Sequence, residues 1–351
     1  MSNTNDFEKY KKLGEPQKQE KAEIWQAAIG LQKADNLTTS SYLIKTAQQN
    51  IEGEISIYEV KERLNEYYKI QPAASQDRTE EADKAAARIT EILGEKTFSF
   101  SPAEYITIHR RLFEGVLDSG IAGKIRDYNI VKKEWVLNGE TIYYASADSI
   151  AAALDYDFKQ EKAFKYKGLT KHEVVEHIAK FISGIWQIHA FGEGNTRATA
   201  VFAIKYLRTF GFKVENDLFS ENSWYFRNAL VRANYNDYKN NIYATSEYLN
   251  RFFGNLLLGE KNILKNREMQ VIIGATVNDT VFLSGEPVND TVFSLIEKDN
   301  KVTAARLAES LGVSISTVKR EIKRLKDNKI IERIGSDKTG AWKIIKKEGK
   351  R

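Results

Sequence analysis

Apolar residues recur every three or four positions along most of the first 260 residues of the chain. Two stretches show this most clearly, residues 174–188 and 197–209, and a short polar break separates them. Residues 131–144 have a β pattern instead and contain Asn138-Gly139, a strong signal for a hairpin turn. The pattern predicts a mainly α protein with one hairpin in this half. Further stretches with helical spacing are residues 23–31, 38–49, 56–68, 79–93, 105–117, 148–158, 221–230 and 243–258.

Three helix starts carry capping signals. Ser56 with Glu59, and Thr170 with Glu173, fit the capping box, in which a hydroxyl and a carboxylate satisfy the free N–H groups of the first turn. Ser101 followed by proline places a cap and a first-turn proline ahead of the next helix. We therefore expect helices to begin at these three points.

The last sixty residues follow a different order of elements. Residues 290–297, 303–311 and 314–326 have the spacing of short helices, and two apolar segments, 330–334 and 341–345, flank a GSDKTG turn. This order resembles a small winged helix-turn-helix domain, whose third helix would enter the major groove of double-stranded DNA. A basic face on a protein-binding winged helix is the alternative. The resemblance implies DNA contacts from Ser316, Thr317, Lys319, Arg320 and Lys323.

Charge separates the same region from the rest of the chain. The 351 residues have a formal net charge of +5, but residues 301–351 contain 15 Lys and Arg against 6 Asp and Glu. The first 300 residues carry 38 basic and 42 acidic residues. A basic end on a mildly acidic body indicates that the C-terminal region meets a polyanion.

Composition narrows the class of protein. The length allows two or three domains, and 42% apolar with 29% charged residues is ordinary for a soluble globular protein. The chain has no cysteine, which excludes disulfides and thiolate metal sites and suits a reducing compartment. Its N-terminus has no apolar signal core, and no stretch approaches an 18-residue apolar span. We therefore expect a cytoplasmic protein without a membrane segment.

The polar break between the two clearest helical stretches gathers the residues of a reactive site. Residues 188–197 read IHAFGEGNTR. A helix beginning near Thr196 points free N–H groups and the positive end of its dipole at this loop. Glycines let a phosphate approach the backbone, Arg197 can pair with its oxygens, and Glu193 is an oxygen ligand suited to Mg²⁺. His189 can act as a general base near neutral pH, so the loop predicts a phosphate-handling site.

This loop resembles the signature of the Fic (Fido) family, H-P-F-x-[D/E]-G-N-G-R-x-x-R. Ala190 replaces the proline, Thr196 replaces a glycine, and Ala200 stands where a second arginine is expected. The resemblance implies a Fic-fold helical bundle with a β-hairpin flap, and transfer of AMP from ATP, with Mg²⁺, to a hydroxyl side chain of a target protein. His189 would be the catalytic base and Glu193 the metal ligand. ATP would be bound by Gly192, Glu193, Gly194, Asn195, Thr196, Arg197, Tyr225 and Asn234, the last two near the adenine.

Two neighbouring features agree with the resemblance, and one residue is read as structural. Residues 122–126 (AGKIR) resemble the segment that Fic domains place before their flap, and the hairpin at 131–144 follows it. In the family this flap pairs with an extended stretch of the target, as in strand addition. A surface hairpin without such a role is the alternative. His109, beside apolar neighbours, is expected to be a core histidine. The residues expected to dock the target are Lys133, Trp135, Thr141 and Tyr143.

The dipeptide Glu52-Gly53 is a further candidate. Inhibitory helices of Fic proteins end in [S/T]-x-x-x-E-[G/N], and the glutamate of that motif blocks the γ-phosphate site of ATP. Here Gln48 replaces the Ser or Thr, and Ala200 replaces the usual partner arginine, which leaves Arg197 as the candidate partner. The alternative is a solvated carboxylate at a helix end, with Gly53 as the C-cap.

The residues leave three functions open. His189 favours an enzyme, whereas Ala200 favours a DNA-binding regulator whose Fic pocket senses nucleotide without turnover. A transferase of another phosphate-containing group is the third. The oligomeric state stays open, with a homodimer as one option. We expect an N-terminal helical region with the inhibitory helix (residues 1–90), a Fic catalytic domain (91–260), a linker (261–288) and a winged helix-turn-helix domain (289–351).

Overall fold

The chain forms two compact units, residues 1–273 and residues 274–351. The computed structural model describes residues 7–70, 78–117, 120–212 and 217–271 of the first unit. In the second unit the described residues are 295–296, 299–304, 306–307, 318–319, 322–323, 325–326, 331–335 and 340–345.

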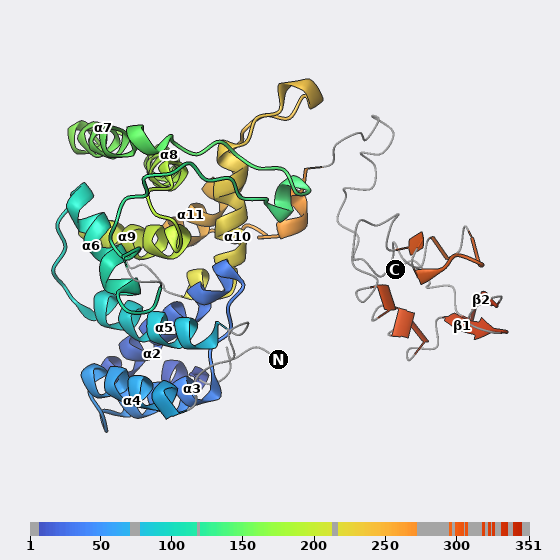
Figure 1. Ribbon diagram of the computed structural model, residues 1–351, viewed down its shortest axis with the longest axis horizontal. Coiled ribbons are helices and arrows are strands. Elements are labelled where there is room, and N and C mark those ends of the chain that lie inside the picture. Colours follow the sequence, from blue (N-terminus) through green and yellow to red (C-terminus); the bar gives the residue numbers. More distant parts are fainter. Residues whose placement is uncertain are drawn as a thin grey trace. The chain divides into compact units, whose positions relative to one another are not determined.

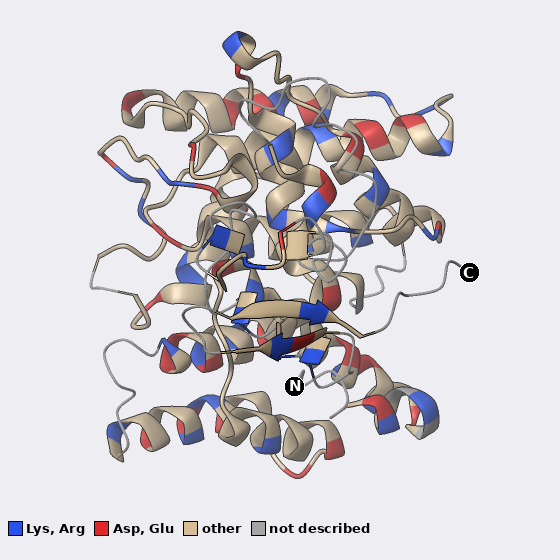
Figure 2. Ribbon diagram, turned by 90° about the vertical axis from the view of Figure 1, so that its right-hand side faces the viewer, with Lys and Arg blue, Asp and Glu red and all other residues tan. Residues whose placement is uncertain are grey.

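The first unit is helical, as the periodicity predicted (Figure 1). Acidic and basic residues are interspersed along its helices (Figure 2). The α-helices are α1 (Glu8–Leu13), α2 (Pro16–Gly30), α3 (Ser41–Glu52), α4 (Ile57–Ile70), α5 (Thr79–Gly94), α6 (Pro102–Phe113), α7 (Ile150–Ala163), α8 (Lys171–Ile188), α9 (Asn195–Thr209), α10 (Asp217–Asn234) and α11 (Glu247–Leu258). The short 3-10 helices are η2 (Leu31–Asp35), η3 (Trp135–Leu137), η4 (Ala147–Ser149), η5 (Tyr238–Asn240) and η6 (Asn266–Met269).

The predicted helix starts are confirmed. The Ser56 hydroxyl accepts from the backbone N–H of Glu59 at 3.2 Å, and the Glu59 carboxylate accepts from the Ser56 N–H at 2.7 Å. Thr170 and Glu173 form the same reciprocal pair at the start of α8. The Ser101 hydroxyl caps α6, whose first residue is a proline. Local chemistry alone therefore sets where these helices begin.

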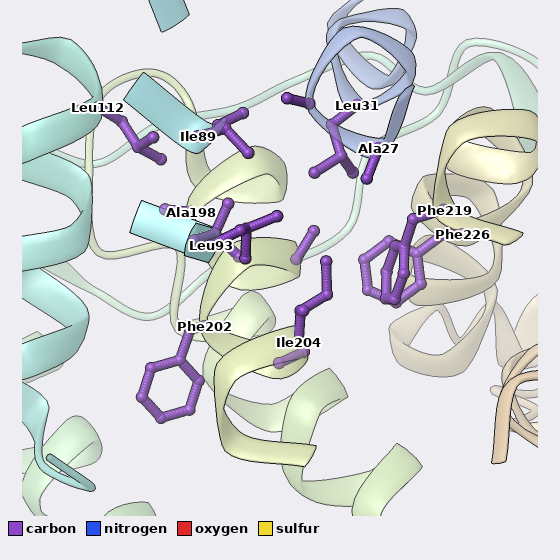
Figure 3. Packing of buried hydrophobic residues seen from close by; sticks show 14 of the residues in the cluster. Ala27, Leu31, Ile89, Leu93, Leu112, Ala198, Phe202, Ile204, Phe219 and Phe226 are labelled. Carbon is purple, nitrogen blue, oxygen red and sulfur yellow. The ribbon is translucent and has the colours of Figure 1, made fainter. Parts of the chain in front are cut away.

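Helix α9, which follows the IHAFGEGNTR loop, lies at the centre of the first unit (Figure 3). All residues from Asn195 to Leu207 are buried, so the helix is covered on every side. Helices α5, α6 and α8 and the short helix η2 pack directly against it. The start of this helix is therefore held rigidly by its neighbours. The buried hydrophobic residues of this core that Figure 3 shows include Ala27, Leu31, Ile89, Leu93, Leu112, Ala198, Phe202, Ile204, Phe219 and Phe226.

The N-terminal helices share this core. Helix α2 packs on both α5 and α10, although the sequence suggested a separate region ending near residue 90. At the crossing with α10, a Cβ on Gly30 would lie 2.2 Å from the Cα of Ser220, so only glycine fits. The Ser223 hydroxyl then donates to the Gly30 carbonyl at 2.8 Å. This close crossing brings η2, which follows Gly30, to the motif helix.

Residues 128–145 turn back at Asn138 and Gly139, as the Asn-Gly signal predicted, and both residues have positive φ. The turn closes with the Glu134 N–H donating to the Glu140 carbonyl at 2.9 Å. The flanking stretches nevertheless form no strand, and η3 begins at Trp135. Val136 lies inside this turn, and its carbonyl accepts from the Val271 N–H at 2.8 Å.

The second unit has its own small core and a hairpin. Strand β1 (Ile331–Ile334) pairs antiparallel with β2 (Ala341–Ile344), which confirms the predicted wing. Lys319 and Lys323 are exposed, as expected for a basic helix face. Ser316, Thr317 and Arg320 lie outside the described residues. The buried apolar residues of this unit are Ile296, Val302, Leu307, Val318, Ile322, Leu325 and Ile331.

Within the described part of the chain, no helix is both long enough and apolar enough to cross a membrane.

The crossing of α2 and α10 gives a test of the fold. We expect Gly30→Ala to lower the free energy of unfolding by about 1–3 kcal/mol, because the added methyl group forces the helices apart. Gly94, at the end of α5, is the matched control, since a Cβ there meets nothing within 4 Å. Gly94→Ala should be neutral or stabilising by up to about 1 kcal/mol. Urea unfolding followed by circular dichroism measures both, and equal midpoints for the two variants would contradict the packing described.

Candidate active site

The loop between α8 and α9 has a conformation that its own residues impose. His189 ends α8 in the left-handed region, with φ 51°, and its N–H donates to the Trp186 carbonyl at 3.0 Å. Gly194 precedes α9 with φ 73°, and a Cβ there would lie 2.4 Å from the ring of Phe113. At Gly192 a Cβ would approach the Tyr128 hydroxyl to 2.6 Å. Gly194 is therefore required by its positive φ and its contact with Phe113, whereas a side chain at Gly192 would displace only the end of the exposed Tyr128 side chain.

Two motif side chains that we predicted to hold phosphate are used inside the loop. The Asn195 amide accepts from the Phe191 N–H at 3.0 Å and donates to the Phe191 carbonyl at 2.7 Å. The Thr196 hydroxyl accepts from the Trp186 indole N–H at 3.1 Å. These side chains fix the loop, and Gly194 gives α9 no side-chain cap. The first backbone N–H groups of α9 therefore remain the groups suited to a phosphate.

One arginine joins the histidine loop to the segment 128–145. Arg126, from the AGKIR segment, donates to the His189 carbonyl at 2.7 Å, to the Tyr128 carbonyl at 2.7 Å and also to the Ala145 carbonyl. Its backbone N–H donates to the Ala190 carbonyl at 3.0 Å. Both ends of the segment and the histidine loop are thereby held by a single buried guanidinium.

His189 is buried between aromatic rings. The Tyr144 ring lies with its centroid 4.0 Å from the imidazole, and Trp186 meets it edge-on at 5.5 Å. Among the described residues neither ring nitrogen of His189 has a hydrogen-bond partner. Burial, together with the positive charges of Lys132 and Arg227, holds the pKa of His189 well below its usual value. The imidazole is therefore neutral near neutral pH, which is the protonation state that a general base requires.

His109 is a structural histidine, as its apolar neighbours predicted. Its ring stacks on Phe191 at 3.7 Å. The Gly123 N–H donates to Nδ1 at 2.9 Å, which places the ring proton on Nε2, and Nε2–H then donates to the Glu193 carbonyl at 2.9 Å. Burial lowers the pKa of His109 to about 4. The neutral ring therefore ties α6 to the motif loop.

Arg197 lies fully buried in a cage of acceptors. Its Nε is 2.6 Å from the Asp35 carboxylate, one terminal nitrogen is 2.7 Å from Glu81, and the other donates to Gln32 at 3.0 Å. The guanidinium also lies over the ring of Phe113, 4.7 Å from its centroid. Two carboxylates therefore occupy the fork that we predicted to hold phosphate.

Glu193 presents its side chain outward while its backbone faces the core. The carboxylate is 47% exposed, and Arg78 is 3.9 Å away. Mg²⁺ in nucleotide sites commonly takes one or two carboxylates together with substrate phosphates. A half-exposed carboxylate beside a helix N-terminus fits that requirement. The predicted metal ligand is thus accessible to a nucleotide-bound cation.

Glu52 does not contact Arg197 in this structure. Its carboxylate ends α3, is 3.0 Å from the ammonium of Lys18 and bonds to Tyr10, and these contacts lower its pKa. Gly53 follows with φ 83° as the predicted C-cap. The expected pairing of Glu52 with Arg197 is therefore wrong, because Asp35 and Glu81 fill the positions around that arginine.

The two residues predicted to lie near adenine, Tyr225 and Asn234, form hydrogen bonds within the protein. Tyr225 is buried in α10, and its hydroxyl donates to the Tyr248 carbonyl at 3.2 Å. The Asn234 amide donates to the Ser183 hydroxyl at 2.8 Å and joins α10 to α8. Their contact with adenine stays a prediction.

The residues expected to dock a target lie on the outside of the 128–145 segment. Tyr143 is 88% exposed and Trp135 is 45% exposed. Lys133 is also exposed, and Thr141 is half-buried. Side chains between them turn inward, including Glu134 and Ile142. The segment therefore has an outer face free for contact and an inner face packed on the site.

Sequence reasoning missed several charged residues of the site. Asp35 and Glu81 surround Arg197, while Arg227 and Glu134 form a pair close to Tyr144. No local pattern in the sequence signals these pairs, because the partners lie far apart along the chain.

Comparison with known proteins identifies the domains. Residues 99–207 match the model of the Fic/DOC family, and residues 289–337 match that of an HTH domain. The chain therefore contains a Fic/DOC domain, followed by a helix-turn-helix domain. Comparison with curated proteins gave no match.

Three solved structures are similar. A Fic family protein from Desulfovibrio desulfuricans G20 shares 14% identity with a TM-score of 0.46, over 100% of this chain and 99% of that one. An N-terminal FIC domain of a VirB-translocated effector from Bartonella sp. 1-1C shares 19% identity with a TM-score of 0.42, over 54% and 88%. A Fic domain containing signaling protein from Bacteroides thetaiotaomicron VPI-5482 shares 20% identity with a TM-score of 0.37, over 88% and 97%.

The buried neutral state of His109 predicts acid sensitivity. Its pKa in the folded protein, about 4, lies below the value near 6.5 of an unfolded chain. The unfolded state therefore binds an extra proton as pH falls below about 6.5, and stability is lost by about 1.4 kcal/mol per pH unit for this group. His109→Gln should reduce the pH slope of the unfolding free energy between pH 6.5 and 5 by that amount. Equal slopes in the unmodified protein and in His109→Gln would contradict the assignment.

Proposed function

We propose that the protein is an adenylyltransferase that moves AMP from ATP to a hydroxyl side chain of a target protein. Fic domains commonly transfer AMP or other phosphate-containing groups. The observation that carries the proposal is that the buried, neutral His189 and the uncapped start of α9 belong to the same short loop. A base and an anion-binding helix end on one short loop are the two parts that such a transfer needs.

The residues divide the reaction as follows. His189 accepts the proton of the target hydroxyl as its oxygen attacks the α-phosphorus of ATP, and the bond from that phosphorus to the pyrophosphate oxygen breaks. The N–H groups of Asn195, Thr196 and Arg197 hold phosphate oxygens at the helix start. Glu193 would hold Mg²⁺, which would supply neutralisation of the phosphate charge. Positioning and charge neutralisation supply most of the acceleration.

The outer face of the 128–145 segment supports docking of a target. Lys133, Trp135 and Tyr143 project from a stretch whose inner face reaches His189 through Tyr144. An extended segment of the target laid along this face would bring its hydroxyl toward the histidine. Side-chain pockets between the exposed residues would then select the target.

The first test uses ATP labelled on the α- or the γ-phosphate, with Mg²⁺, incubated with the protein and cell lysate. We expect label from the α-position only. His189→Ala should lower the labelling rate by about 10²–10⁴-fold, because the base is lost. His172→Ala, at an exposed histidine, should match the unmodified protein. Labelling from the γ-position would indicate transfer of another phosphate group, and nucleotide binding without any labelling would favour a nucleotide sensor.

Inhibition by Glu52 is part of the same proposal. Its support is the Glu52-Gly53 motif at the end of α3, although the carboxylate contacts Lys18 here. We expect Glu52→Gly to increase α-labelling, because a glutamate that blocks the γ-phosphate would be removed. Glu54→Gly, two residues away, is the control. Equal labelling in both variants would refute inhibition by Glu52.

For the helix-turn-helix domain we propose binding to double-stranded DNA. The favouring observation is that Lys319 and Lys323 are exposed, whereas the residues that precede them, Val318 and Ile322, are buried. Changing both lysines to Glu should weaken binding to random-sequence DNA and lower the slope of log affinity against log salt by about 0.9 for each phosphate that is no longer neutralised. The control changes exposed Lys12 and Lys159 of the first unit to Glu. Equal salt slopes in both double variants would exclude this face.

A further inference from the structure

Two arginines from different helices converge on one carboxylate beside the motif. Asp35, the last residue of η2, lies 2.6 Å from Arg197 Nε of α9 and 3.3 Å from Arg227 Nη1 of α10. Arg227 also makes a two-bond contact with Glu134, at 2.9 and 3.0 Å. Paired guanidinium groups facing a single oxyanion are the geometry that phosphate oxygens favour.

A series of contacts connects this cluster to His189. Glu134, which holds Arg227, accepts from the Tyr144 hydroxyl at 3.3 Å, and the Tyr144 ring covers His189. Arg227 is also among the charges that act on the His189 imidazole. An anion bound between Arg197 and Arg227 would therefore be connected to the base through Arg227, Glu134 and Tyr144.

The cluster opens on the side of Arg227. The side chain of Arg197 is fully buried, whereas those of Asp35 and Arg227 are 14% and 16% exposed. Helix α9 supplies no second arginine one turn further on, because position 200 is a buried alanine. A second phosphate-binding cation must then come from another helix, and Arg227 is placed to provide it.

We propose that Arg227 is a phosphate-binding residue of the ATP site, and that the Asp35 carboxylate occupies the position that a phosphate of ATP takes. This inference rests on the proposed function. Displacement of Asp35 would exchange one anion for another between the same two arginines, so the positive charges stay compensated throughout. Asn36, which follows Asp35, has a left-handed backbone with φ 59°, and η2 ends there.

A purely structural ion pair makes a different prediction from an anion site. If Asp35 only braces the helices, its neutralisation weakens the fold and leaves anion binding unchanged or weaker. If it stands in for a phosphate, Asp35→Asn removes a competing charge and strengthens anion binding. Loss of Arg227 weakens it. Stability falls in both variants, so it does not distinguish the two interpretations. The opposite signs of the two effects on anion affinity do distinguish them.

The experiment measures binding by calorimetry in full-length His189→Ala protein, in which no transfer takes place. The probes are MgATP, inorganic triphosphate and adenosine. We expect Arg227→Gln to weaken MgATP and triphosphate by about tenfold or more, Asp35→Asn to strengthen both by a similar factor, and adenosine binding to stay within about twofold. Arg232→Gln, at a buried arginine of the same helix, is the matched control and should leave all three unchanged.

Each outcome decides the inference. Triphosphate binding that is not strengthened by Asp35→Asn overturns it, as does an Arg227→Gln effect no larger than that of Arg232→Gln. If Arg227→Gln does not fold, Asp35→Asn decides alone. Expected binding effects without α-label transfer by the unmodified protein would uphold the anion site and reject the adenylyltransferase. Label transfer by the unmodified protein, together with anion binding that Asp35→Asn and Arg227→Gln leave unchanged, would uphold the adenylyltransferase and reject the anion site.

Discussion

The buried guanidinium of Arg197 governs how the first unit is assembled. A charge without solvent must be compensated, and removing its partners leaves a large desolvation penalty. Its compensation comes from Asp35 at the end of η2 and from Glu81 on α5. Both elements must therefore reach the first turn of α9. The N-terminal helices are for this reason part of the site, and the close crossing at Gly30 is the means by which η2 arrives there.

The motif loop shows how one sequence can combine structure with chemistry. Asn195 and Thr196 bond within the loop, and Gly194 permits contact with Phe113. These residues keep His189 and the start of α9 in fixed relation. Because these side chains bond within the loop, its backbone N–H groups and the neutral imidazole of His189 remain available to a ligand. Rigid placement of this kind lowers the reorganisation needed during a transfer.

Signals between residues close in sequence predicted much of this structure. Pairings between residues far apart in sequence could not be predicted in the same way. Helix periodicity, the capping boxes and the Asn138-Gly139 turn depend on residues a few positions apart, and each was found. Arg197, by contrast, meets Asp35 and Glu81 from distant parts of the chain, and no periodicity encodes which carboxylate will arrive. The turn at Asn138-Gly139 formed as expected, but the strands expected on either side of it did not, and a residue distant in sequence, Val271, bonds to Val136 within the turn. The family signature located His189 in the sequence. The charged residues around it could be identified only from the folded structure.

The bonds of Arg126 have a consequence for how this protein can diverge. Those described here end on main-chain oxygens, at His189, Tyr128 and Ala145, and so are indifferent to which side chains those positions carry. Substitutions along the outer face of the segment leave this anchorage untouched. Side chains on the outer face of the segment can therefore change while the loop that carries His189 keeps its geometry.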